Sequence, residues 1–462
     1  MAKILEKHKK YKDTYGSNEV FWGLGIELET YFQFEKPIHV AAPILRKCHK
    51  AERYSVDYYK SYKALHEKVF QMMFPDSSGC FPLPFFFNGH CLSKMDRHGV
   101  HTTTYEKTPQ PNPKFMGKIL LDELKEYSLL FKDDHEVRYV FDGDTVEFMT
   151  LDFYKAKAAT VIKELVDYKI RFLKELNSFI KKQGLHKEKG ALVYPPRNPG
   201  FAVFYSNPGN VVMFNNGTYH INLTLPSMLG PQNEDGIPTL AYPDLFRQQH
   251  KVCIKMFQWF EPFLIAVYGT PDPLSFTSPI FSKGSQRCAV SRYIGIGTYD
   301  VEKMPEGKIM TLSIKEVIGS QTDYWWYTTY HKISGYIALE QIGMDINYKK
   351  HYNHGIELRF FDWFSEDKLQ TLITELVYLC EVALDCDETS VAALSKTWNL
   401  FVIGVLKEGA GFKITDEIAA IYERILGIPL LGSQRTVTEA FEYIFKELKR
   451  KYKGGECVRR LL

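Results

Sequence analysis

Four short segments of this chain alternate apolar residues with charged or polar ones, and this alternation limits the folds that the chain can adopt. Successive side chains of a β-strand point to opposite faces of the sheet, so each segment would bury an apolar face and present a polar one. Such half-buried strands are typical of antiparallel sheets, because parallel sheets are buried on both faces. The segments are residues 25–30, 138–148, 218–224 and 355–360.

The polar faces of these segments differ in chemistry from an ordinary solvated sheet. A solvated face usually carries Lys, Thr, Ser and Gln, and strands are depleted in Asp and Glu. Taken alone, each segment is more often an ordinary half-buried strand whose polar face meets water. Together, however, the four faces present acidic residues, a histidine and an arginine. These residues are Glu27, Glu29, Glu147, His220 with Asn222 and Thr224, and Glu357 with Arg359.

The second segment contains an Asp-Gly step between two apolar runs, which is a strong hairpin signal. A hairpin there would bring Asp142, Asp144 and Glu147 into one small region. Carboxylates aligned on one sheet repel one another, and divalent cations would remove that repulsion. Mg²⁺ prefers hard oxygen ligands, and Mg²⁺ and Mn²⁺ tolerate a single imidazole, whereas a dedicated zinc site needs more nitrogen or sulfur.

The order of these motifs resembles that of the glutamine synthetase and glutamate-cysteine ligase superfamily, most closely its amidoligase (carboxylate-amine ligase) branch. The motifs are G-x-E-x-E, D-x-x-x-x-E in a hairpin, H-x-N and E-x-R, and they span roughly residues 21 to 364. The resemblance implies an α+β fold with a curved antiparallel β-sheet and helices packed on its convex face. It also implies a concave face that binds ATP and two or three Mg²⁺ or Mn²⁺ ions. Family members phosphorylate a carboxylate with ATP and let an amine displace the phosphate.

The resemblance assigns roles to individual residues. Asn222 is expected to contact the cofactor, and Arg359 the phosphoryl group in transfer. This chain has Asp144 where many relatives carry serine, so the choice between Asp142 and Asp144 as a ligand stays open. The full set of expected metal ligands is Glu27, Glu29, Asp142 or Asp144, Glu147, His220 and Glu357.

Residues 281–293 follow a proline-rich loop and carry several cations. The segment resembles the arginine-bearing stretch that family members place over phosphate and substrate carboxylate. Arg287 and Arg292 are expected to be catalytic together with Arg359, and Lys283 and Arg292 to bind ATP. Guanidinium groups suit carboxyl and phosphoryl oxygens because they donate two parallel hydrogen bonds. The alternative, above all for Lys283, is a solvated basic loop.

The sequence therefore favours an ATP- and Mg²⁺-dependent ligase that joins a carboxylate to an amine through an acyl phosphate. A two-metal phosphoryl hydrolase or nuclease would use the same acidic cluster without forming ADP. A degenerate binding module that keeps the fold is a third interpretation. The expected partners are carboxylate and amine substrates, such as an amino acid, a peptide or a protein tail. Their identity and the oligomeric state stay open.

Composition excludes several other classes. The net charge of +3 gives no reason to expect nucleic acid as a partner of the whole chain, although a local basic patch is compatible with it. The eight cysteines are scattered without a C-x-x-C pair, which predicts reduced thiols and a cytoplasmic protein. No stretch fits a membrane span or a signal peptide. Gly23-x-Gly25 is predicted to form a turn. A structural or solvent-exposed role is favoured over a zinc site for His90, Cys91, His98 and His101.

Helical periodicity is strongest over residues 153–183, where a basic last turn precedes Gly184 as the stop. Further helices are predicted over 43–73, 116–131, 245–268, 324–342, 366–385 and 435–452. Loops rich in proline and glycine are predicted over 192–217, 226–243 and 270–288, where long irregular segments indicate lids or binding loops. We expect one elaborated catalytic domain over 1–462, with the core motifs in 21–364 and a mainly helical C-terminal extension in 365–462.

Overall fold

The structure is a computed structural model, and its described part has an α+β architecture of helices and antiparallel sheets. It describes residues 13–30, 32–35, 38–41, 80–83, 120–142, 145–151, 153–184, 186–194, 218–234, 236, 238–269, 346–347, 355–359, 361–386, 390, 392, 395–430 and 434–462.

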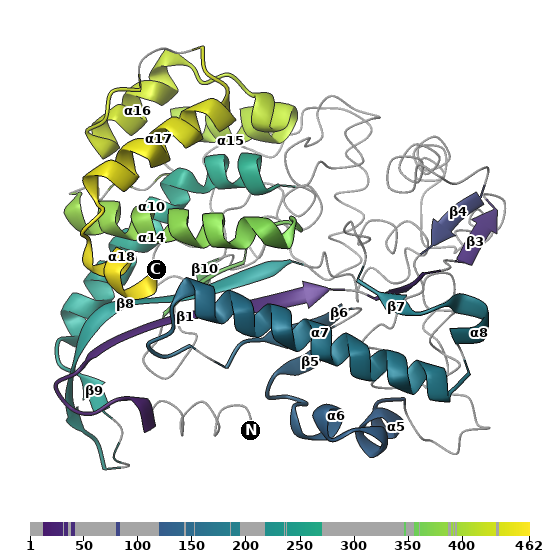
Figure 1. Ribbon diagram of the computed structural model, residues 1–462. Coiled ribbons are helices and arrows are strands. Elements are labelled where there is room, and N and C mark those ends of the chain that lie inside the picture. Colours follow the sequence, from purple (N-terminus) through teal and green to yellow (C-terminus); the bar gives the residue numbers. More distant parts are fainter. Residues whose placement is uncertain are drawn as a thin grey trace, which may run out of the picture.

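A seven-stranded antiparallel sheet lies at the centre of the described residues (Figure 1). Its strands follow the order β10-β11-β8-β1-β6-β5, and β9 pairs with the far end of β8. All four alternating segments fall on this sheet, so the predicted antiparallel strands are confirmed. The bounds are β1 Val20–Thr30, β5 Tyr139–Asp142, β6 Thr145–Met149, β8 Tyr219–Gln232, β9 Pro238–Leu240, β10 Ile346–Asn347 and β11 Ile356–Leu358.

Two small strand pairs lie outside the main sheet. One joins β2 and β7, and the other joins β3 and β4. Their bounds are β2 Gln33–Phe34, β3 Ile38–Ala41, β4 Cys80–Leu83 and β7 Leu192–Val193.

The apolar face of the main sheet is covered by helices. Figure 1 shows α7 (Ala158–Lys182) along the sheet, with α10 (Pro243–Tyr268) and α14 (Leu369–Asp385) beside it. Helix α7 contacts β1 and β6, α10 contacts β8, and α14 packs on both helices. The alternating pattern therefore places every second strand residue in the core, as expected for a sheet that is buried on one face. These strand residues are Leu24, Ile26, Leu28, Val146, Phe148, Ile221, Leu223, Ile356 and Leu358.

The other helices surround this central layer. Helices α15, α16 and α17 lie farther from the strands, and α18 returns to contact β1 and β8 (Figure 1). The remaining bounds are α5 Leu120–Tyr127, α6 Leu129–Asp133, α8 His186–Lys189, α15 Lys396–Glu408, α16 Asp416–Leu426, α17 Val437–Lys451 and α18 Glu456–Leu461, with 3-10 helices η8 Glu366–Lys368 and η10 Gly409–Gly411. Within the described residues, no helix is both long enough and apolar enough to cross a membrane.

Most of the predicted helices that can be compared are confirmed. Helix α7 begins later than predicted, at Ala158, and Gly184 follows it with a φ of 78°, a conformation that favours glycine. Helices α10, α14 and α17 match the predictions over 245–268, 366–385 and 435–452. The helical structure predicted near 116–131 is confirmed from Leu120 on, but it is divided into α5 and α6 at Ser128. Ser128 has an extended backbone there, and its Oγ accepts a hydrogen bond from Leu130 N at 3.3 Å, so it caps a second helix.

The loop predicted over 226–243 is wrong, because β8 continues to Gln232 and β9 pairs with it. Pro226 and Pro231 lie where the strand register shifts, so their missing N–H groups do not interrupt a regular ladder. The predicted loop over 192–217 begins with β7. Residues 195–217, the predicted loop 270–288, the predicted helices 43–73 and 324–342, and the His90 to His101 cluster lie outside the described residues.

Candidate metal centre

The polar face of the sheet collects the side chains that the alternation predicted there. Glu27 of β1 pairs with His220 of β8, and Glu29 pairs with Glu147 of β6. Glu357 of β11 pairs with Asn222 of β8. Residues directly opposite in an antiparallel pair project from the same face, so the register alone brings four strands to one site.

Three of these side chains come close enough to share one ion. His220 Nδ1 lies 3.5 Å from Glu27 Oε2 and 3.6 Å from Glu357 Oε1. One ligand atom from each of these three residues lies within 4.8 Å of the others. Glu29 lies next to this group, with its Oε2 3.8 Å from His220 Nε2. The arrangement is a compact set of carboxylate oxygens around one imidazole.

The group is buried, and burial makes its charged side chains destabilising for the fold. Glu27, Glu29, His220 and Glu357 are at most 4% exposed. Buried carboxylates destabilise a fold unless a cation or hydrogen-bond donors compensate them. Arg359 supplies part of this compensation, because its Nη1 lies 3.7 Å from Glu357 Oε2 while its side chain stays 32% exposed.

Two polar atoms of the site have no hydrogen bond to any described residue. They are His220 Nε2 and Asn222 Oδ1, and both are buried. Such atoms are usually satisfied in native proteins, so they point to a ligand at this face. Two carboxylates and one imidazole suit a hard divalent ion better than zinc. Glu27, His220 and Glu357 can therefore hold a metal ion.

Two threonines fix the backbone next to the site. Thr150 Oγ1 accepts a hydrogen bond from Ile26 N at 3.0 Å and lies 3.3 Å from Ile26 O, which holds β1 directly before Glu27. Thr218 Oγ1 donates to the carbonyl oxygen of Phe361, which joins the start of β8 to the chain after β11. No local sequence pattern indicates either threonine, because both bonds join segments that are distant in the chain.

The turn predicted at Gly23-x-Gly25 is wrong, because both glycines lie inside β1. The ring of Phe153 packs on them. A Cβ on Gly23 would lie 2.1 Å from Phe153 Cε1, and one on Gly25 would lie 2.9 Å from Phe153 Cδ2. The paired glycines therefore make room for an aromatic ring beside Asn222, and no local sequence pattern indicates that ring.

Some of the predicted site residues cannot be placed. The backbone of Asp142 pairs with Thr145 in the β5–β6 hairpin, so the predicted hairpin is confirmed. The side chain of Asp142 and the whole of Asp144 lie outside the described part, and the choice between them stays open. The basic segment with Lys283, Arg287 and Arg292 also lies outside the described residues.

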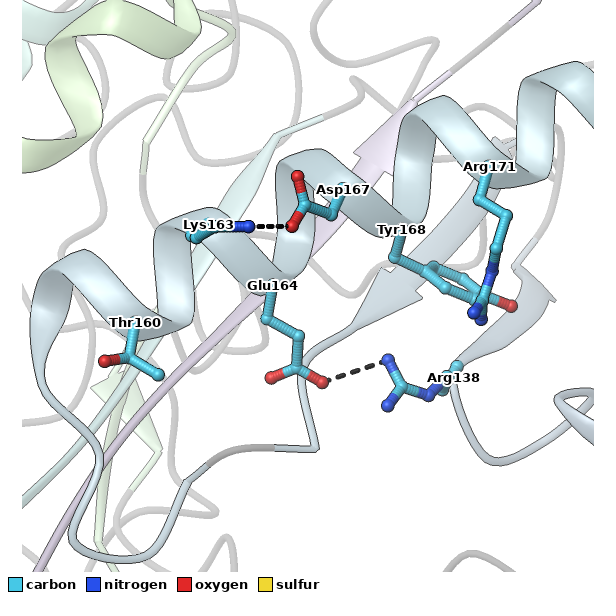
Figure 2. A pocket seen from close by; sticks show the side chains of 7 residues that line it. All are labelled: Arg138, Thr160, Lys163, Glu164, Asp167, Tyr168 and Arg171. Carbon is cyan, nitrogen blue, oxygen red and sulfur yellow. Dashed lines mark hydrogen bonds and ion pairs between the residues drawn. The ribbon is translucent and has the colours of Figure 1, made fainter.

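A separate hollow of about 370 Å³ lies on α7, the helix that covers the apolar face. Figure 2 shows cations and carboxylates side by side along it. Arg138 pairs with Glu164 at 3.1 Å, and Lys163 pairs with Asp167. Arg171 pairs with Asp134, outside the lining, at 3.3 Å. Because each cation has a carboxylate partner, the hollow offers no strong attraction for an ionic ligand. It is lined by Arg138, Thr160, Lys163, Glu164, Asp167, Tyr168 and Arg171.

A further buried acid, Glu375, lies in the helical layer, away from the polar face. Glu375 of α14 accepts a hydrogen bond from Tyr268 Oη of α10 at 2.6 Å. Burial raises the pKa of Glu375 to about 7, and this outweighs the lowering by the Tyr268 hydrogen bond and the charge of Lys449. This carboxyl group therefore titrates near neutral pH without belonging to the candidate metal centre.

Comparison with known proteins finds a relative of this chain in a virus. The protein named "Uncharacterized protein R704" of Acanthamoeba polyphaga mimivirus is 37% identical to it over 462 residues, which cover 99% of this chain and 79% of the viral protein. The chain belongs to the family of R704. No family model matches the chain. The name of R704 states no activity, so a function for this family member must be argued from the site.

Proposed function

We propose that the chain is an ATP- and Mg²⁺-dependent carboxylate-amine ligase that forms an amide or isopeptide bond through an acyl phosphate. The observation that carries the proposal is the convergence of Glu27, His220 and Glu357 within 4.8 Å on one buried face. These residues come from three different strands in the order that the resemblance to amidoligases predicts.

The proposed fold is that of the glutamine synthetase and glutamate-cysteine ligase superfamily, with a curved sheet and helices on its convex face. The described architecture supports it in one respect. The helices α7, α10 and α14 cover the apolar face of the antiparallel sheet, while the acidic residues lie on the opposite face. A sheet with one helical face and one ligand face is what the proposal requires.

In the proposed reaction, Glu27, His220 and Glu357 hold one divalent ion, and Glu29 with Glu147 contributes to a further ion. The metal ions, when bound, neutralise the charge on the phosphate oxygens. Arg359 donates hydrogen bonds to the γ-phosphoryl group during its transfer. The substrate carboxylate attacks the γ-phosphorus, and the bond to the leaving ADP breaks. The amine nitrogen then attacks the acyl carbon, loses a proton and releases phosphate.

Analysis of the nucleotide products tests the proposal. The full chain is incubated with ATP, Mg²⁺ and a panel of amino acids and amines, and the nucleotides are separated by chromatography. We expect ADP and phosphate, formed together with an amide product. Glu27→Gln is expected to abolish the reaction, whereas Glu442→Gln, an exposed residue of α17, serves as the matched control.

Each other outcome has a distinct meaning. AMP with pyrophosphate would indicate an adenylating enzyme and would overturn the acyl-phosphate mechanism. Release of phosphate without an amide product would favour the two-metal phosphoryl hydrolase. Binding of Mg²⁺ without any nucleotide turnover over the whole panel would favour a binding module.

A further inference from the structure

Positive charge is concentrated near the C-terminal end of the described chain. Residues 446–460 contain seven basic and two acidic residues, a net charge of +5, whereas the whole chain carries only +3. The remaining residues therefore sum to a net negative charge. The small net charge of the whole chain is therefore distributed asymmetrically along the sequence. Such charge asymmetry is typical of proteins that interact with a polyanion.

The structure brings this segment together with the start of α7. Figure 1 shows the end of α17, helix α18 and the start of α7 close together. Lys157, directly before α7, donates from Nζ to the carbonyl oxygen of Arg459 in α18 at 3.2 Å. We call these exposed cations the C-terminal basic face, and its members are Lys157, Lys446, Lys449, Arg450, Lys453 and Arg459.

Neighbouring carboxylates compensate only part of this charge. Arg450 pairs with Glu447 at 2.8 Å, Lys451 pairs with Asp385 at 3.1 Å, and Arg459 and Arg460 both pair with Glu456. Lys157, Lys446 and Lys453 form no ion pair with a described residue. Basic residues at the C-terminal end of a helix interact favourably with the helix dipole, and this explains the basic residues in the last turn of α17. That effect does not account for Lys157 or Lys453, which lie outside the helix.

Two aromatic rings lie beside this face, each in contact with a further cation of the same segment. Arg460 Cζ is 4.9 Å from the ring centroid of Trp22, and Lys451 Nζ is 4.7 Å from that of Tyr452. Both rings are partly exposed. Surfaces that bind single-stranded nucleic acids combine cations, which follow the phosphates, with aromatic rings, on which bases stack. An acidic polypeptide would use the cations but gain little from the rings.

We propose that the C-terminal basic face binds the phosphate backbone of single-stranded nucleic acid without reading its sequence. The expectation drawn from the net charge of the whole chain left room for a local basic patch, and binding depends on local charge. The proposal does not depend on the ligase activity, since none of the residues of the basic face belongs to the candidate metal centre.

Fluorescence anisotropy of the full chain with a labelled oligothymidylate of about 20 nucleotides tests this proposal, at low and at physiological salt. We expect affinity to fall steeply as the salt concentration rises. Protein binding releases salt cations that are condensed on the phosphates, and added salt makes this release less favourable. The triple substitution Lys446→Glu, Arg450→Glu and Lys453→Glu is expected to weaken binding at least about tenfold. Added ATP with Mg²⁺ is expected not to displace the oligonucleotide.

The matched control changes the total charge by the same amount on another part of the molecule. It is the triple substitution Lys132→Glu, Lys174→Glu and Lys181→Glu, at exposed positions of α6 and α7. We expect it to change affinity by no more than about twofold. A second variant with glutamine at positions 446, 450 and 453 repeats the test with a milder change, and thermal melts verify that each variant is folded.

Three results would overturn the proposal. The first is the absence of binding by the parent chain at low salt. The second is an equal loss of affinity in both glutamate triples, which would show that only the total charge matters. The third is competition by polyglutamate as effective as by unlabelled oligothymidylate, which would assign the basic face to an acidic protein instead.

Discussion

Glu27 and His220 face each other across the two central strands of the sheet, with Glu27 Oε2 3.5 Å from His220 Nδ1 and both side chains almost fully buried. Glu357 approaches the same nitrogen from the next strand, at 3.6 Å. Two carboxylates therefore share one imidazole in a region from which water is excluded. Such a group is stable only if further positive charge reaches it, and this requirement leads to the first prediction.

We predict that Mg²⁺ or Mn²⁺ raises the melting temperature of the parent chain, more so with ATP present. An ion that binds only the folded state stabilises it by mass action, by about 2.7 kcal/mol at a concentration of 100 times its Kd. Glu27→Gln removes one ligand and is expected to abolish most of this shift. Thermal melts with metal and with a chelator measure it. Melts of the parent that coincide under both conditions would contradict the metal site.

We predict that Arg359→Lys lowers turnover at least about tenfold, equivalent to about 1.4 kcal/mol of transition-state stabilisation, with little change in stability. Lysine keeps the charge but loses the two parallel hydrogen bonds of the guanidinium group. If Arg359 only paired with Glu357, at 3.7 Å, lysine would be tolerated in turnover, because it keeps a positive charge beside the buried carboxylate.

Turnover and denaturation midpoint are therefore measured on the same preparation of Arg359→Lys. Unimpaired turnover would remove Arg359 from the catalytic residues. It would also weaken the match of the fourth motif to the amidoligase pattern.

We predict that Gly23→Ala destabilises the fold by about 1–3 kcal/mol, as overpacking of a filled core does. The new Cβ would lie 2.1 Å from Phe153 Cε1, so the ring or the strand must move. Gly411→Ala is the control, because its Cβ would meet nothing within 4 Å. Urea denaturation of both variants measures the difference, and equal midpoints would show that Phe153 yields without cost.

We predict that the stability gained by Glu375→Gln depends on pH. The pKa of Glu375 rises from its ordinary value of 4.5 to about 7 on folding, so between these values the folded chain holds a proton that the unfolded chain has lost. The free energy of unfolding therefore falls as pH rises through this window. Glutamine removes that loss. At about 1.4 kcal/mol per pKa unit, the variant gains up to about 3 kcal/mol over the parent above pH 7.

Denaturation of parent and variant at pH 4 and pH 8 checks the sign of this effect. No gain is expected at pH 4, where Glu375 is protonated in both states. Glu442→Gln, on the exposed side of α17, provides a baseline without pH dependence of this kind. A gain of equal size at both pH values would refute the burial of an ionisable Glu375.

The part of the site that the sequence predicts is the part governed by strand alternation. A period of two residues is a local property, so it placed Glu27, Glu29, His220 and Glu357 on polar faces before any pairing was known. The register that joins those faces depends on the whole sheet. Alternation predicts that Glu27 and His220 each lie on a polar face, but it does not predict that they lie opposite each other. That follows only from the pairing of β1 with β8.

Most differences between the sequence predictions and the structure arise from contacts between distant segments, and the one at Ser128 is local. Gly23 and Gly25 suggested a turn because glycine is frequent in turns, whereas here they admit the ring of Phe153. Pro226 and Pro231 suggested a loop, yet each lies at an irregularity of β8 where the lost N–H does not matter. Ser128 ends one helix and caps the next, which the apolar pattern around it does not reveal.

The placement of β8 between β1 and β11 has a consequence for the folding of the chain during its synthesis on the ribosome. The three residues of the metal group come from the beginning, the middle and the last third of the chain. A nascent chain can pair β1 with β8 long before β11 has emerged, and during that interval Glu27 and His220 already face each other while Glu357 is absent. Pairing between such distant segments is slow. The metal group is therefore completed only after β11 has emerged, and a chain truncated before β11 lacks Glu357 and with it the centre.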